Sequence, residues 1–163
     1  MQTKSKCLLA NMKVASFDIV FQEVPNEVSL ALNISGCPNR CKGCHSPHLW
    51  EDTGEDLTTD LLDGLLCRYG AGITCVCFMG GDQDPKYVAQ LASFIRARGL
   101  KTAWYSGREF DLTTCPEAEV FDYIKTGPYI ETLGGLKTPT TNQRMYCKDE
   151  QTWSDITNSF WRK

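Results

Sequence analysis

The chain has 163 residues, of which 42% are hydrophobic and 23% charged, so its composition is that of one globular domain and excludes intrinsic disorder. The formal net charge of −3 and the lack of a basic block give little support to nucleic-acid binding. No apolar run is long enough to span a membrane, and residues 1–6 are not followed by the apolar segment of a secretory signal. We therefore expect a cytoplasmic protein whose nine cysteines are reduced, so that metal or redox roles are favoured over disulfides. We expect a single domain over residues 1–163, with its core over 14–146 and a tail over 147–163.

The first secondary-structure signal is a pair of alternating apolar patterns. One runs over residues 14–21 and the other over residues 28–35, with a turn at Pro25 between them. A period of two residues is typical of strands, so the two patterns predict a strand pair. The second strand leads directly into Cys37.

Helix and strand patterns then alternate along the chain. A helix is expected over residues 58–70, with a threonine at its N-cap and a glycine at its end, and a buried strand follows over 73–79. A second helix over 85–99 precedes strands over 100–105 and 120–124. Strands that are joined through helices form parallel sheets with right-handed crossovers. The pattern therefore predicts an α/β domain with a mostly parallel sheet.

The ends of these strands indicate where a ligand would bind. The chain breaks after the predicted strands at Gly36, Gly80, Ser106 and Thr126. The carboxyl ends of parallel strands meet at one edge of a sheet, where loops and helix N-termini bind ligands. We expect all four breaks to lie along that edge.

Three cysteines follow the first of these breaks. Cys37, Cys41 and Cys44 are spaced C-x3-C-x2-C in a loop that contains proline and glycine. Thiolates are soft ligands that select zinc, Cu(I) or iron–sulfur clusters. Because a [4Fe–4S] cluster normally takes four cysteines, three would leave one iron open to an exogenous ligand. The spacing favours such a cluster.

Zinc is the alternative that the residues leave open. Structural zinc sites use four protein ligands, usually as two separated pairs, and the chain has no second C-x2-C pair. His45 or His48 would complete a set of three cysteines and one histidine. The chain would then be a non-enzymatic, zinc-binding regulatory module.

The cysteine motif at the end of an early strand, together with G-G-D at residues 80–82, resembles the radical S-adenosylmethionine superfamily. Three further stretches are similar to the activating proteins of anaerobic ribonucleoside-triphosphate reductases: H-S-P-H-L-W at 45–50, W-Y-S-G at 104–107 and P-T-T-N-Q-R at 139–144. The resemblance covers residues 16–146, which is most of the chain. It implies a small incomplete (β/α) barrel of radical SAM type, open on one side to a macromolecular partner.

Two positions depart from the superfamily's usual pattern. Gly43 stands where an aromatic residue is common, which fits the reductase-activator branch and weighs against an activase of formate-lyase type, the nearer alternative. Asp82 stands where many members have the glutamate of a Gly-Gly-Glu motif, so the carboxylate is kept but has a shorter reach.

The resemblance implies an oxidoreductase that activates a glycyl radical enzyme. Cys37, Cys41 and Cys44 would hold one [4Fe–4S] cluster whose fourth iron chelates S-adenosylmethionine. Reductive cleavage would give methionine and a 5′-deoxyadenosyl radical, which abstracts hydrogen from a glycine of the large catalytic subunit of the reductase. A low-potential donor such as a flavodoxin would supply the electron. No catalytic residue is implied beyond the cluster ligands.

Five further residues are candidates for binding the cofactor. The backbones of Gly80 and Gly81 can approach a ligand closely because no Cβ is in the way. Asp82 completes that motif. By resemblance, Ser106 and Lys125 lie at strand ends where they would touch S-adenosylmethionine, and the Lys125 ammonium can pair with its carboxylate.

The remaining cysteines are given no chemistry: Cys7, Cys67, Cys75, Cys77, Cys115 and Cys147. Cys75 and Cys77 are two residues apart on a predicted strand and therefore share one face, where packing is the expected role. The run from Thr140 to Arg144 suggests a partner or cofactor contact by resemblance alone.

Overall fold

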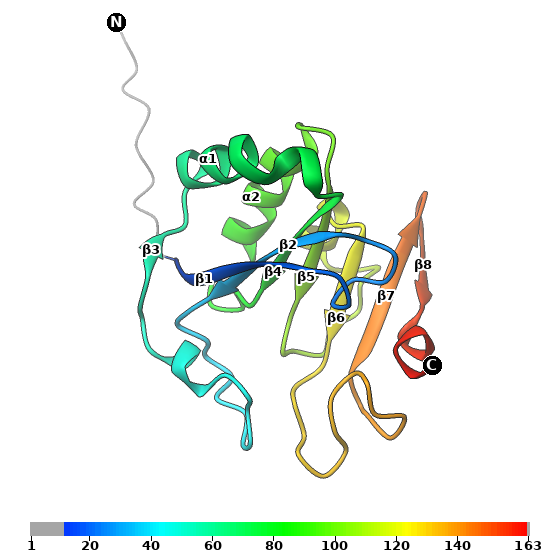
Figure 1. The fold of residues 1–163 in the computed structure, drawn as a ribbon. Helices are drawn as coiled ribbons and strands as arrows, with labels where there is room; N and C mark the ends of the chain where they lie inside the picture. The colour runs from blue at the N-terminus through cyan, green and yellow to red at the C-terminus, as the bar shows by residue number, and fades with distance from the viewer. Residues whose placement is uncertain (1–11, 163) are drawn as a thin grey trace, which may run out of the picture.

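The fold is described from a computed structural model for residues 12–162, so Cys7 lies outside the described residues. The strands are β1 (Lys13–Val20), β2 (Ser29–Ile34), β3 (Glu55–Asp56), β4 (Cys75–Met79), β5 (Lys101–Tyr105), β6 (Tyr123–Thr126), β7 (Arg144–Asp149) and β8 (Thr152–Asp155). The α-helices are α1 (Thr59–Tyr69) and α2 (Pro85–Arg96) (Figure 1), and the 3-10 helices are η1 (Pro47–Trp50), η2 (Gly70–Gly72), η3 (Pro116–Val120) and η4 (Thr157–Trp161). None of the helices in this part of the chain is long and apolar enough to cross a membrane.

All eight strands form one sheet in the order β3-β1-β2-β4-β5-β6-β7-β8. The three central pairings, β2–β4, β4–β5 and β5–β6, are parallel. The four pairings toward the margins are antiparallel, so the expectation of a mostly parallel sheet is wrong. The reason is that β1–β2 and β7–β8 are joined by turns, which reverse the chain, whereas only the central strands are joined through helices.

Local signals at the helix ends match the predicted helices. The hydroxyl of Thr58 accepts the backbone N–H of Leu61 at the start of α1. The carboxylate of Asp84 accepts the backbone N–H of Tyr87 at the start of α2. Such side chains satisfy amide groups that the first helical turn leaves free. The second helix ends at Arg96, before the predicted limit of residue 99.

The last predicted parallel strand is displaced along the chain. We expected a strand over residues 120–124, but β6 begins at Tyr123 and a 3-10 helix that starts at Pro116 precedes it. Proline suits the first turn of a helix because its fixed φ fits and its missing N–H is not needed there. The side chain of Asp122 accepts the backbone N–H of Thr102 at 2.9 Å, which ties the start of β6 to β5.

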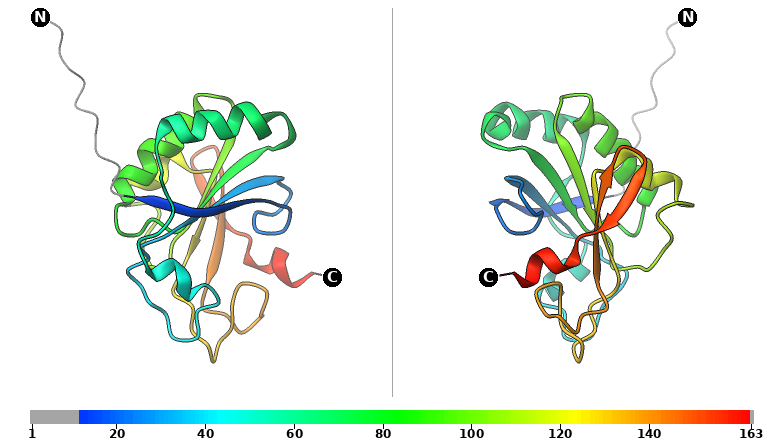
Figure 2. Two further views of the ribbon diagram at one scale, coloured as in Figure 1. Left: turned by 60° about the vertical axis from the view of Figure 1, so that its left-hand side comes forward. Right: turned by 90° about the vertical axis from the view of Figure 1, so that its right-hand side faces the viewer.

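The sheet has a separate apolar cluster on each face. On one face, Leu32 and Phe78 from the central strands pack with Leu91 and Ile95 of α2. Both α-helices cover this face of the sheet (Figure 2). The other face carries a smaller cluster that contains Cys75, Cys77, Ala103, Tyr123 and Met145. Burial of Cys75 and Cys77 confirms the packing role predicted for these two thiols.

The segment expected as a C-terminal tail contributes to the sheet. Residues 144–149 form β7, which pairs with β6, and residues 152–155 form β8. The backbone N–H of Met145 donates to the hydroxyl of Thr157 at 2.9 Å, so η4 lies against the base of β7. The sheet order ends at β3 and β8, and no pairing among the described strands joins those two ends.

Strand β1 has a free edge over most of its length. Within residues 12–162 its pairing with β3 involves only Lys13 and Val14. Beyond that point Phe17 and Ile19 are 38% and 37% exposed, and Phe21 in the following turn is 69% exposed.

The breaks after the four parallel strands lie at one edge of the sheet, as predicted. The backbone N–H of Gly80 donates to Tyr105 O at 3.1 Å, and that of Ser106 donates to Lys125 O at 2.9 Å. The segment after β2 and the segment between β6 and β7 lie at the same end of the molecule in all views (Figures 1 and 2). This end carries the candidate site.

Candidate functional site

The cysteine loop begins where β2 ends and closes on itself. The backbone N–H of Gly36 donates to Glu51 O at 3.2 Å, and that of Cys37 donates to Leu49 O at 3.0 Å. These bonds bring the two ends of the loop together, so the cysteines lie on a closed excursion from the sheet. Arg40 and Gly43 adopt positive φ angles of 45° and 76°, which turn the chain sharply between the cysteines.

The three cysteines of the loop are free and half-buried. All three lie close enough to Lys125 to interact electrostatically with its ammonium group. Lys125 is 7% exposed, and its Nζ donates to Ser106 O at 3.1 Å and to Gly127 O at 2.8 Å. Burial lowers the pKa of Lys125 to about 8, although Asp82 and the three cysteines act in the opposite direction. The loop thus lies near a buried cation at the end of β6.

The donor set of three cysteines fits an iron–sulfur cluster, because thiolates are the usual ligands of such clusters. Within residues 12–162, no three or more His, Cys, Asp or Glu side chains form a group that could hold one metal ion. A zinc site takes four ligands about 2.0–2.3 Å from one ion. His45, a candidate fourth ligand, has its Nε2 3.4 Å from the Tyr129 hydroxyl.

Asp82 connects the cysteine loop to the ends of β4 and β5. Its Oδ2 accepts Asn39 Nδ2 at 2.6 Å and the backbone N–H of Gly107 at 2.8 Å. Its Oδ1 accepts the hydroxyl of Ser106 at 2.6 Å. Asp82 and Ser106 are 3% and 1% exposed, so this network is closed to solvent. Asn39 had no predicted role beyond loop shape.

The two glycines before Asp82 are required by contacts within the protein. Gly80 and Gly81 have φ angles of 117° and 97°, which L-residues rarely adopt. A Cβ on Gly81 would stand 2.4 Å from Val88 Cγ2 on α2, and one on Gly80 would meet the backbone oxygen of Ile34 at 3.3 Å. These contacts within the protein are enough to explain why both positions are glycine, without reference to a ligand.

A second loop, residues 127–143, lies against the cysteine loop; we call it the strap. The rings of Tyr129 and His45 have centroids 5.2 Å apart. The carboxylate of Glu131 fills the space beside Gly43, where a Cβ would stand 2.9 Å from Glu131 Cδ. Apart from the run from Thr140 to Arg144, the strap was not predicted to be part of the site.

The run from Thr140 to Arg144 holds the strap in shape. Thr140 Oγ1 donates to Leu133 O at 2.8 Å, and Thr141 Oγ1 donates to Gly134 O at 2.9 Å. Asn142 Nδ2 donates to Pro128 O at 3.0 Å. These bonds satisfy carbonyl groups that have no partner in a helix or strand. In the sequence, short polar side chains that follow a glycine-rich stretch are the signal that indicates such a hydrogen-bonded loop.

Between the strap and the sheet lies a cavity of about 520 Å³, which we call the inner cavity. Its walls include Cys44, Tyr105, Lys125, Tyr129 and Gln143. Its volume is in the range of sites for small molecules and cofactors.

Two of the other predicted site residues line a different hollow. Asp82 and Ser106 face a cavity of about 440 Å³ beside the start of α2. Cys44 and Lys125 are therefore the predicted residues that line the inner cavity, and the bonds from Asp82 and Ser106 connect the two regions.

Comparison with known proteins supports an iron–sulfur function. Residues 27–132 match the family model described as a 4Fe-4S single cluster domain. The chain is 27% identical over 138 residues to the anaerobic ribonucleoside-triphosphate reductase-activating protein of Enterobacteria phage T4, with 76% of this chain and 86% of that protein covered. No solved structure matches the chain significantly.

Proposed function

Because the chain belongs to the 4Fe-4S single cluster domain family, we propose that it activates an anaerobic ribonucleoside-triphosphate reductase by means of a [4Fe–4S] cluster and S-adenosylmethionine. The observation that carries the proposal is the position of the three cysteines, which lie in one loop near the buried ammonium of Lys125, with Cys44 and Lys125 both lining the inner cavity. The name of the phage T4 relative supports the choice of reductase.

Cys37, Cys41 and Cys44 are the proposed cluster ligands. A [4Fe–4S] cluster, reduced by a low-potential donor such as a flavodoxin, supplies the electron that splits S-adenosylmethionine into methionine and a 5′-deoxyadenosyl radical, which takes hydrogen from a glycine of the large reductase subunit. The protein holds the thiols in one closed loop. The backbone N–H of Ser46 donates to Cys44 Sγ at 3.4 Å, which helps to fix the position of that sulfur.

Lys125 is the proposed partner of the cofactor's carboxylate. Its ammonium is held by two carbonyl groups, which leaves a third N–H donor for a ligand in the inner cavity. The backbones of Gly80 and Gly81 and the groups of Asp82 and Ser106 are proposed to bind the cofactor from the adjoining strand ends. Asp82 and Ser106 already bond each other, so we assign them chiefly to holding that edge in place.

The sheet is proposed to be an incomplete barrel of radical SAM type. The parallel centre of the sheet and the unpaired margins at β3 and β8 support this assignment. A barrel that is open on one side leaves the inner cavity accessible to a folded partner, which a glycine donor requires.

We also propose that the protein works in the reducing environment of the cytoplasm. Every cysteine in residues 12–162 is a free thiol. The chemistry proposed above requires the cluster thiolates to stay reduced.

The test begins with the protein purified without oxygen and reconstituted with iron and sulfide. Reduced protein is incubated with S-adenosylmethionine, and 5′-deoxyadenosine is quantified by chromatography. We expect product from the wild type and from Cys67→Ser, an exposed control thiol. We expect none from Cys37→Ser, Cys41→Ser or Cys44→Ser.

Metal analysis of the same samples tests the zinc alternative. Tight zinc binding without an iron–sulfur absorption band, lost when His45 and His48 are replaced, would overturn the proposal. A glycyl radical signal obtained with a formate-lyase type partner, and absent with the anaerobic reductase, would reassign the partner.

A further inference from the structure

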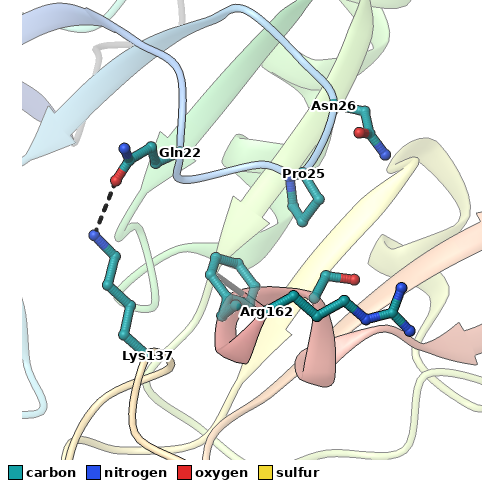
Figure 3. Close-up of a pocket in the computed structure, with 7 residues that line it drawn as sticks. Gln22, Pro25, Asn26, Lys137 and Arg162 are labelled. Atoms are coloured by element: carbon teal, nitrogen blue, oxygen red, sulfur yellow. Dashed lines mark hydrogen bonds between the residues drawn. The ribbon is translucent and has the colours of Figure 1, made fainter.

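A second cavity adjoins the inner cavity. It has a volume of about 540 Å³, and we call it the outer cavity. Its walls come from the turn between β1 and β2, from the strap and from η4 (Figure 3). Gln22, Lys137 and Phe160 line both cavities, so the outer cavity lies directly beside the inner cavity, which Cys44 and Lys125 line.

The walls of the outer cavity are basic and neutral. Lys137 and Arg162 are among its seven lining residues, and none of the seven is acidic, although the chain has a net charge of −3. Lys137 Nζ donates to the amide oxygen of Gln22 at 3.2 Å, which is a neutral partner. Arg162 makes no hydrogen bond or ion pair with any residue in the range 12–162. Glu23 lines the inner cavity and not the outer one.

The two cations stand at opposite sides of the outer cavity. Figure 3 shows Gln22 and Lys137 on one side, Asn26 and Arg162 on the other, and Pro25 between them. An extended polypeptide can place carboxylates at both sides while an apolar residue lies over Pro25.

We propose that the outer cavity binds an acidic stretch of the polypeptide whose glycine enters the inner cavity. The inference rests on the proposed function, because it identifies how that substrate segment is recognised. Carboxylates bound by Lys137 and Arg162 would fix the register of the segment, so that the glycine stands beside Cys44 and Lys125. Arginine suits this role because its planar group binds a carboxylate through two parallel hydrogen bonds.

The test measures peptide binding to the reconstituted full-length protein by fluorescence anisotropy. Two labelled peptides of equal length carry a central glycine; one has aspartate and glutamate on one side, and the other has asparagine and glutamine there. We expect the acidic peptide to bind roughly tenfold more tightly at low salt, with the preference reduced as salt rises.

Charge variants identify the residues responsible. Lys137→Gln and Arg162→Gln are each expected to remove most of the preference, whereas Lys86→Gln on α2 leaves it intact. The double variant Lys137→Glu/Arg162→Glu is expected to prefer a peptide with lysines in place of the acids. Equal affinity for both peptides, or an equal loss with Lys86→Gln, would overturn the inference.

Formation of 5′-deoxyadenosine without any peptide separates the two proposals. Arg162→Gln is expected to form it at the wild-type rate, because Arg162 lines the outer cavity and not the inner one. The wild type could form no 5′-deoxyadenosine and still bind the acidic peptide through Lys137 and Arg162. In that case the proposed function fails, and the assignment of the outer cavity as a binding site for acidic peptides stands.

Discussion

The side chain of Asn39, inside the cysteine loop, donates to the carboxylate of Asp82 at 2.6 Å, forty-three residues away along the chain. The same carboxylate accepts Ser106 and the backbone of Gly107. One buried acid therefore couples the first two cysteines to the ends of two strands. A Cβ on Gly107 would stand 2.5 Å from Asn39 Nδ2, so the loop has little freedom to move there.

Replacing Asp82 is expected to destabilise both the fold and the cluster. Asp82→Ala leaves buried donors without an acceptor, which costs about 1–3 kcal/mol in the free energy of unfolding of the cluster-free protein. Asp82→Asn keeps one acceptor oxygen and should cost less. Urea unfolding measures the first effect, and decay of the iron–sulfur absorption band measures the second. Asp56→Asn on the exposed strand β3 is the control, and an equal loss there would contradict the role of Asp82.

Gly43→Ala is expected to strain the cysteine loop. Gly43 has a φ of 76°, and an added Cβ meets Glu131 Cδ at 2.9 Å. The backbone strain alone costs about 1–2 kcal/mol, while the side chain of Glu131 can swing aside. The double variant Gly43→Ala/Glu131→Ala should therefore recover only part of the stability, as measured by urea unfolding. Gly72→Ala, where an added Cβ meets nothing within 4 Å, is the matched control.

Lys125→Met is expected to weaken binding of S-adenosylmethionine about tenfold, because a charge-assisted hydrogen bond contributes about 1.5–3 kcal/mol. The cluster itself should remain, since Lys125 is not a ligand. Titration of the cofactor, followed by the electron paramagnetic resonance of the reduced cluster, gives the affinity. Lys125→Arg keeps the charge but not the two carbonyl contacts, so an intermediate affinity is expected. Unchanged affinity in Lys125→Met would remove this residue from the cofactor site.

At the opposite edge of the sheet, Glu27 makes a second buried network. Its carboxylate accepts Lys101 Nζ at 2.7 Å, Tyr123 Oη at 2.8 Å and Thr74 Oγ1 at 2.5 Å. Burial raises the pKa of Glu27, but these three hydrogen bonds and the charge of Lys101 together hold it below the ordinary value of 4.5. The unfolded chain therefore takes up a proton first as the pH falls.

The stabilisation from Glu27 is thus expected to be complete above pH 4.5 and to disappear as the pH falls through the lower, folded-state pKa. Glu27→Gln should cost about 1–3 kcal/mol at neutral pH and flatten the dependence of stability on acid. Urea unfolding between neutral and acidic pH tests both effects. Glu55→Gln on the exposed strand β3 should change neither the stability at neutral pH nor its dependence on pH. If the stability of Glu27→Gln fell with pH as steeply as that of the wild type, the role assigned to Glu27 would be contradicted.

The central elements of the fold were predictable because local signals agreed with the long-range structure. Thr58 and Asp84 occupy the N-cap positions of the two helices, and the apolar run before Gly80 is the buried strand β4. The margins were harder. Strands β7 and β8 form a hairpin joined by residues 150 and 151, but their short sequences, RMYCKD and TWSD, are largely polar and gave no clear strand pattern.

The candidate site was also predictable from the sequence only in part. The spacing of the three cysteines indicated a metal loop, and the position of Lys125 at a strand end placed it nearby. Asn39 and Tyr129 were missed because their partners, Asp82 and His45, lie more than forty residues away. A polar residue in a loop gives no sign of which distant group it meets until the sheet brings the loops together.

Within residues 12–162, the free edge of β1 favours aggregation of this protein at high concentration. Unpaired backbone groups beside Phe17, Ile19 and Phe21 offer a template on which further strands can add. Asp18 lies between the first two and is the charge that opposes such stacking. Aggregation should therefore increase when that carboxylate is replaced by a neutral side chain.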